Sequence, residues 1–133
     1  MKTTFAILIS TVLIISAIFL TSNKKSIYNE TLIETQQPIN NVSTVGDKQI
    51  IEITAKGGYT PRKSIAKAGI PTILRFNTKG TFDCSSSVRI PSMNISKILP
   101  QSGVTDIDLG SKKTGTLQGS CGMGMYPFEI EFQ

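Results

Sequence analysis

The sequence predicts an all-β sandwich of antiparallel strands, preceded by a single membrane-spanning helix. Two observations lead to this fold class. Short runs rich in β-branched and aromatic residues follow one another over residues 48–133, separated by glycine and proline, which is typical of sandwiches and barrels. Residues 5–20 form an uncharged and mostly apolar run, which is typical of a transmembrane helix.

Residues 1–22 are expected to form a retained membrane anchor. Phe5–Leu20 is FAILISTVLIISAIFL, and a helix over residues 3–22 would be about 30 Å long, which matches the hydrocarbon core of a bilayer. A cleaved signal peptide is the alternative. The apolar run is long for one, however, and no pair of small residues marks a cleavage site at its end. No cysteine follows the run either, which argues against a lipoprotein signal.

Basic residues on the two sides of this span favour, by a small margin, a soluble domain on the cytoplasmic face of the cell membrane. Lys24 and Lys25 follow the span, whereas Lys2 and the terminal amine precede it. Basic residues close to a span tend to stay on the cytoplasmic side. The expected topology is therefore single-pass.

Residues 23–47 are expected to be a flexible tether, because they are rich in Asn, Gln, Ser and Thr and show no hydrophobic periodicity. Residues 48–133 are expected to be the globular domain, with 11 Lys and Arg against 6 Asp and Glu. These charges are scattered and have no aromatic platform between them, so a nucleic-acid partner is not expected. An acidic protein or anionic lipid suits this surface better.

The domain contains seven expected strands. Gly57 and Gly58 end the first, Pro91 stops the fourth, and the last carries Phe128, Ile130 and Phe132 on one face. The spacing of apolar residues in 92–99 predicts one or two helical turns instead. The expected strands are 48–56, 64–68, 71–79, 87–90, 104–110, 115–121 and 127–133.

Four sulfur atoms form the candidate metal site: those of Cys84, Cys121, Met123 and Met125. Met93 has the spacing of a core residue, but Met123 and Met125 lie in the glycine-spaced loop CGMGM. Glycine there frees the backbone to point both thioethers at one place. Thiolate and thioether are soft ligands that select Cu(I), whereas the chain lacks the four thiolates of a zinc site and the histidines of a blue-copper site.

The alternative is an extracytoplasmic sandwich that binds no metal, has a Cys84–Cys121 disulfide, and serves adhesion or assembly. This alternative gives no reason for the loop methionines, and the chain lacks the core tryptophan of an immunoglobulin-like domain. An enzyme is not expected, since there is no histidine, no paired carboxylates and no closely spaced cysteine pair. No small-molecule substrate is expected either.

The segments GGYTP and CGMGM, with Cys84 between them, resemble the copper-handling cupredoxins of bacterial copper resistance. The anchor and tether make the whole plan similar to that of membrane-anchored Cu(I) chaperones in this group. The resemblance implies a cupredoxin-like Greek-key sandwich. In ordinary cupredoxins a histidine occupies the place of Cys84, and a histidine and a methionine follow the strand-ending cysteine. This chain has sulfur at all of these places, so blue colour and electron transfer are not implied.

The resemblance also implies two Cu(I) ions per chain. One would be held mainly by Cys84 and Cys121, and a second, weaker one by Met123 and Met125 with a shared cysteine. The implied partner is a copper-exporting P-type ATPase with a similar soluble domain. The expected function is therefore that of a Cu(I) chaperone in copper resistance, which passes its ion to the exporter by ligand exchange.

Overall fold

The structure, a computed structural model, describes residues 40–133. The expected anchor at 1–22 and most of the expected tether at 23–47 lie outside the described residues. Within 40–133, no helix has the length and apolar character needed to cross a bilayer.

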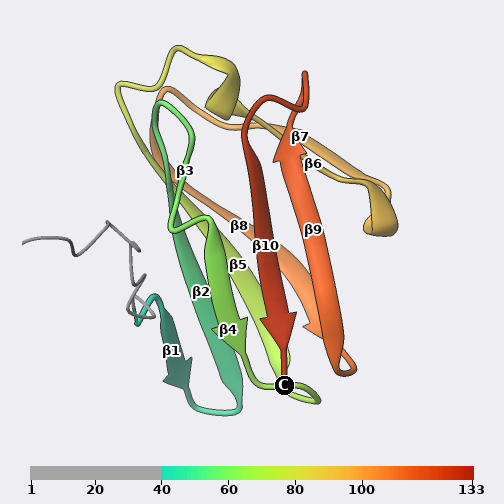
Figure 1. The fold of residues 1–133 in the computed structure, drawn as a ribbon. Helices are drawn as coiled ribbons and strands as arrows, with labels where there is room; N and C mark the ends of the chain where they lie inside the picture. Colours follow the sequence, from blue (N-terminus) through green and yellow to red (C-terminus); the bar gives the residue numbers. More distant parts are fainter. Residues whose placement is uncertain (1–39) are drawn as a thin grey trace, which may run out of the picture. The chain divides into compact units, whose positions relative to one another are not determined.

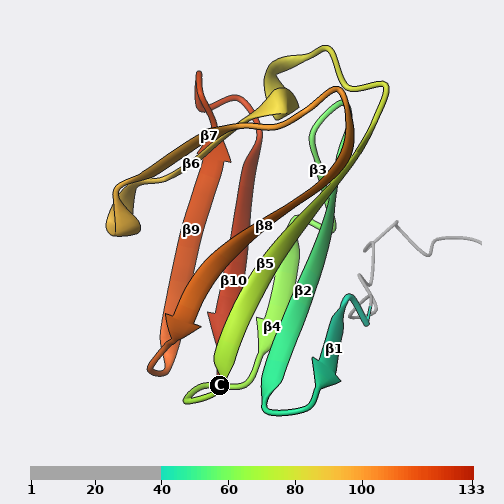
Figure 2. The same ribbon diagram turned by 180° about the vertical axis from the view of Figure 1, so that it is seen from behind.

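Two five-stranded sheets pack face to face over residues 42–132 (Figures 1 and 2). In the first sheet the order is β1-β2-β5-β8, with β3 paired to β2, and in the second it is β4-β10-β9-β6-β7. The strands of the first sheet are β1 (Val42–Val45), β2 (Lys48–Ala55), β3 (Tyr59–Thr60), β5 (Pro71–Lys79) and β8 (Ser102–Ser111). Those of the second are β4 (Lys63–Ala66), β6 (Ser87–Ile90), β7 (Ile95–Ile98), β9 (Gly115–Cys121) and β10 (Pro127–Phe132).

The sandwich is confirmed, but the expectation of purely antiparallel sheets is wrong for two pairs. β2 pairs with β5 in parallel, and β4 pairs with β10 in parallel. The reason is that β4 lies in the second sheet. The chain leaves the first sheet after β3, crosses to β4, and returns to place β5 beside β2 in the same direction.

All seven expected strands are present, and three further strands were not expected. Residues 42–45, which the sequence assigns to the tether, form β1 and pair with β2. The helical turns expected over 92–99 are also wrong for most of that stretch. A short 3₁₀ turn η2 (Pro91–Met93) ends at Asn94, whose φ of 53° is left-handed, and the chain then reverses as β7 to pair with β6.

Alternating residues of both sheets form the core. In β5, for example, every second residue is buried and the intervening ones are partly exposed. Three aromatic rings meet near the centre of the core: Tyr59, Phe76 and Phe128 pack edge to face, with centroids 5.1–5.6 Å apart. Tyr59 and Phe76 belong to the first sheet and Phe128 to the second, so these rings pack the two sheets together.

Replacing Gly119 by alanine is expected to destabilise the fold by about 2–3 kcal/mol, because it overpacks this core. Gly119 lies opposite Phe128 across β9 and β10, and a Cβ at this position would lie 2.2 Å from the ring. Urea unfolding measures the effect. Gln118→Ala is the matched control, since Gln118 is the exposed neighbour on β9; equal stability of the two variants would contradict this account.

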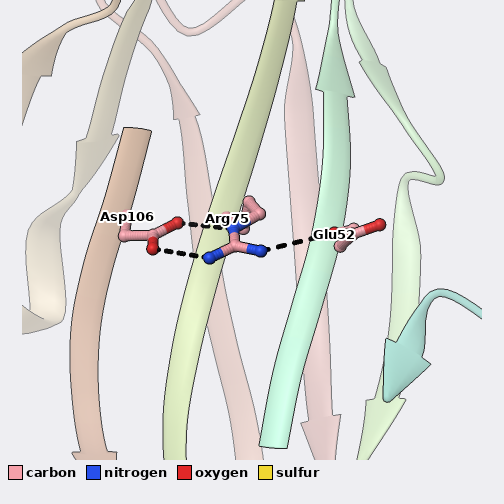
Figure 3. Close-up of polar contacts among 3 residues, drawn as sticks. All are labelled: Glu52, Arg75 and Asp106. Carbon is pink, nitrogen blue, oxygen red and sulfur yellow. Dashed lines mark hydrogen bonds and ion pairs between the residues drawn. The ribbon is translucent and has the colours of Figure 1, made fainter. Parts of the chain in front are cut away.

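The outer face of the first sheet carries a row of charges across three strands (Figure 3). Arg75 of β5 donates from Nε and one terminal nitrogen to the two carboxylate oxygens of Asp106 on β8, each at 2.8 Å. Its other terminal nitrogen lies 3.8 Å from the carboxylate of Glu52 on β2. The pKa of Asp106 is lowered by the hydrogen bonds from Arg75. All three side chains are partly exposed, so this row contributes little to stability.

Candidate metal centre

The two cysteines lie together at one end of the sandwich. Cys84 is the first residue of the 3₁₀ turn η1 (Cys84–Ser86), in the crossover from β5 to β6, and Cys121 is the last residue of β9. Both segments lie at the upper end of the molecule in Figures 1 and 2. The structure joins the two sulfurs in a disulfide, with the Cα atoms 5.8 Å apart. The fold therefore brings together residues that are 37 positions apart in the sequence.

The disulfide is the pairing that the alternative function predicts, and its sulfurs have no thiolate to offer a metal ion. Reduction by two electrons and two protons would release two thiols at the same place. Cys121 is fully buried and Cys84 is partly buried. The same pair can thus form either a disulfide or, when reduced, a pair of soft ligands.

The methionines extend from the loop that follows Cys121. Met123 is 74% exposed and Met125 is 57% exposed, so neither belongs to the core. Met93, by contrast, packs against the core, as expected from the sequence. Since the loop begins at Cys121, both thioethers are carried by the segment next to the cysteine pair.

Local contacts explain the glycines of this loop. The N–H of Cys121 donates to the carbonyl of Tyr126 at 3.1 Å, and the N–H of Gly124 donates to the carbonyl of Cys121 at 2.9 Å, which closes a tight turn. Gly124 has a left-handed φ of 75°. At Gly122, a Cβ would lie 2.8 Å from the Ser87 hydroxyl. The glycines therefore permit a sharp turn and a close approach, in addition to spacing the methionines.

The turn that carries Cys84 is capped by Asp83. One carboxylate oxygen of Asp83 accepts the N–H of Ser85 at 2.8 Å and also the hydroxyl of Ser85. The pKa of Asp83 is lowered, first by these hydrogen bonds from Ser85 and then by one from Gly57. Asp83 was not among the expected site residues, although an aspartate two residues before a serine is the pattern of such a cap.

Tyr59 lies beside this turn but is not a ligand. Its hydroxyl donates to the carbonyl of Ser87 at 2.9 Å. Burial, with a smaller effect of the Asp83 charge, raises the pKa of Tyr59 far above its usual value, so the phenol stays protonated. Over residues 40–133, no three carboxylate, imidazole or thiol groups come together in a way that could hold a metal ion. In the described part of the chain, the sulfur atoms are thus the candidate ligands.

Comparison with solved structures shows the same fold in two copper proteins. The metal binding domain of the Cu(I) exporting P-type ATPase CopA of Streptococcus pneumoniae D39, with Cu(I), has a TM-score of 0.62 and 22% sequence identity. The match covers 69% of this chain and 92% of that one. A copper binding protein in the apo form has a TM-score of 0.64 and 22% identity, over 69% of this chain and 94% of that one. No curated protein matches the chain.

The family itself is shown by sequence. Residues 11–130 match the model of the cupredoxin-like domain. This match spans most of the chain and agrees with the two-sheet architecture of residues 42–132. It confirms the resemblance inferred from GGYTP, Cys84 and CGMGM at the level of the family. The chain belongs to the cupredoxin-like domain family.

Proposed function

We propose that the protein is a membrane-anchored Cu(I) chaperone that delivers cuprous ion to a copper-exporting P-type ATPase in copper resistance. One observation carries the proposal: the fold places Cys84 and Cys121 within bonding distance, beside a loop that exposes Met123 and Met125. Two thiolates and two thioethers with no histidine form a ligand set that selects Cu(I). The expected anchor and tether, together with these four sulfur positions, resemble the plan of the membrane-anchored Cu(I) chaperone CupA.

Two Cu(I) ions per chain are proposed, in unequal environments. The reduced cysteine pair would hold one ion tightly, because thiolates are charged and soft. The exposed methionines, with a shared cysteine, would hold a second ion more weakly. Delivery proceeds by ligand exchange, in which a thiolate of the acceptor binds the ion before a ligand of this chain leaves.

The proposed partner is the soluble domain of the exporter. The metal binding domain of CopA has the same fold as residues 42–132, so donor and acceptor domains of one architecture are a reasonable pair. An anchor at 1–22 would confine this chain to the membrane of the exporter and raise the effective concentration of each protein for the other.

The proposed location of the β domain is the cytoplasmic face, where thiols are kept reduced. Labelling by an impermeant thiol reagent before cell lysis would contradict that location.

A Cu(I) titration tests the function. The full chain in detergent is reduced, mixed with Cu(I) and a competing chelator, and compared with the oxidised chain. The reduced chain is expected to take two Cu(I) ions, while the oxidised chain loses the tight site, because a disulfide offers no thiolate. Equal and weak binding by both forms would contradict the proposal.

The second candidate is a disulfide-stabilised module without metal, which the observed Cys84–Cys121 bond favours. In such a module the bond is structural, so its reduction should lower the free energy of unfolding by about 3–4 kcal/mol and confer no affinity for Cu(I). The titration above separates the two candidates. For the chaperone, the reduced form is the functional one.

A further inference from the structure

One turn of the first sheet contacts both loops that carry sulfur. This turn joins β2 to β3 and contains Gly57 and Gly58; it is closed by a hydrogen bond of 3.0 Å from the N–H of Lys56 to the carbonyl of Gly58. Both glycines have positive φ, 63° and 127°, which ordinary side chains disfavour. The sequence GG is thus required by the shape of this turn.

On one side, the turn binds the Cys84 loop through Asp83. The N–H of Gly57 donates to Asp83 Oδ2 at 2.9 Å, while Asp83 Oδ1 accepts from Ser85. The backbone carbonyl of Asp83 also accepts from Ser86, from the N–H at 3.0 Å and from the hydroxyl at 2.8 Å. Asp83 therefore holds both residues that follow Cys84 and ties that turn to the neighbouring sheet.

On the other side, the turn packs against the methionine loop. A Cβ at Gly58 would lie 3.8 Å from Cδ1 of Tyr126, so the Tyr126 ring lies directly over Gly58. The carbonyl of Tyr126 accepts the N–H of Cys121. The same turn is thereby connected to Cys84 through Asp83 and to Cys121 through Tyr126. None of these contacts involves a sulfur atom, so reduction of the disulfide does not remove them.

We infer that Asp83 is a positioning residue, whose hydrogen bond to Gly57 keeps the two thiols of the reduced chain close enough to bind one Cu(I) ion. The consequence for Cu(I) rests on the proposed function, but the consequence for thiol geometry does not. Holding two reacting groups in place raises their effective concentration. A looser Cys84 loop should therefore weaken both disulfide formation and binding of a metal ion by the pair.

The test is the thiol–disulfide equilibrium of Asp83→Asn with glutathione. The protein dithiol and oxidised glutathione exchange to give the protein disulfide and two reduced glutathione molecules, so the equilibrium constant reports the effective concentration of the two thiols. The asparagine oxygen can still accept from Ser85, but its NH₂ group faces the N–H of Gly57. The hydrogen bond is present in both redox forms, so the constant changes only because the reduced Cys84 loop gains freedom that the disulfide denies to the oxidised loop. Since a hydrogen bond to a charged group sets the upper limit, the constant should fall by up to about tenfold.

Asp106→Asn is the matched control. It removes a carboxylate that accepts two hydrogen bonds from Arg75 on the outer face of the first sheet (Figure 3), away from both sulfur loops. Its equilibrium constant is expected to equal that of the natural chain. Should Asp83→Asn fail to fold, Tyr126→Ala takes its place, because it releases the other loop from Gly58 and should shift the equilibrium in the same direction.

An unchanged equilibrium in folded Asp83→Asn overturns the inference, as does an equal shift in the Asp106→Asn control. The full chain is then titrated with Cu(I), where Asp83→Asn should bind the tight ion about tenfold more weakly. A shifted thiol equilibrium in a chain whose natural form binds no Cu(I) supports the positioning role and rejects the chaperone. The two hypotheses are therefore separable.

Discussion

Replacement of Cys121 by serine is expected to abolish tight Cu(I) binding. A hydroxyl is a hard, neutral donor, whereas Cu(I) prefers thiolate. Changes to groups that only support a ligand typically weaken metal binding about 10–100-fold, so loss of a ligand should weaken it by more than about 100-fold. A competition titration of the reduced full chain measures the change.

The fold is expected to survive this substitution. The backbone N–H and carbonyl of Cys121 keep their bonds to Tyr126 and Gly124 whatever the side chain is. Because Cys121 is fully buried, a serine there costs about 1–3 kcal/mol unless its hydroxyl finds a partner. Stability must be compared with the reduced natural chain, since the variant also lacks the disulfide.

Cys84→Ser is the matched variant. Cys84 is only partly buried, so its replacement should cost less stability than that of Cys121 while removing the same tight site. If both variants fold and retain the affinity of the natural chain, the cysteine pair is not the metal centre. If both variants lose Cu(I) binding although their free energies of unfolding differ, the loss cannot be explained by destabilisation. Both cysteines are then ligands and not residues needed only for folding.

Local sequence patterns predicted those strands whose ends are set by local chemistry. Pro71 and Gly80 mark the two ends of the run at 71–79, and Pro91 ends the run at 87–90; the structure has β5 and β6 with those limits. The prediction of helical turns was wrong at 92–99. The apolar residues there are spaced nearly as in a helix, but the chain forms a hairpin of β6 and β7. Pairing of β7 with β6 outweighed local periodicity there. β1 was missed because VSTV lies in a polar stretch, and only pairing with β2 makes it a strand.

The ligand types of the candidate site could be predicted from the sequence, but their arrangement could not. The composition alone shows that the chain offers soft sulfur ligands and has no histidine. The proximity of Cys84 to Cys121 depends on the crossover from β5 to β6 and on the register of β9 with β6, where Val88 lies opposite Cys121. The link from Asp83 to Gly57 likewise joins segments 26 residues apart that no local pattern relates.

The second large effect is expected in copper transfer: the copper-loaded full chain should pass Cu(I) to the soluble metal-binding domain of the exporter. Similar sulfur ligands in donor and acceptor would make this exchange nearly neutral, so that active export draws it forward. Each tenfold difference in affinity corresponds to about 1.4 kcal/mol, and a mismatch of a few such steps would stop delivery. A weaker, exposed site next to the tight pair offers a path for exchange.

Met123 and Met125 are placed for that role, being 74% and 57% exposed. Their joint replacement by leucine preserves size and apolar character but removes the thioethers, so transfer should slow while the final distribution of copper changes little. Met93→Leu, at a side chain packed against the core, is the matched control and should transfer Cu(I) at the rate of the natural chain.

The copper-loaded chain and the copper-free acceptor are mixed, separated at intervals and analysed for copper. Equal rates in all three proteins would remove the methionines from the pathway, and copper that stays on this chain at equilibrium would make it a sequestering protein instead of a donor.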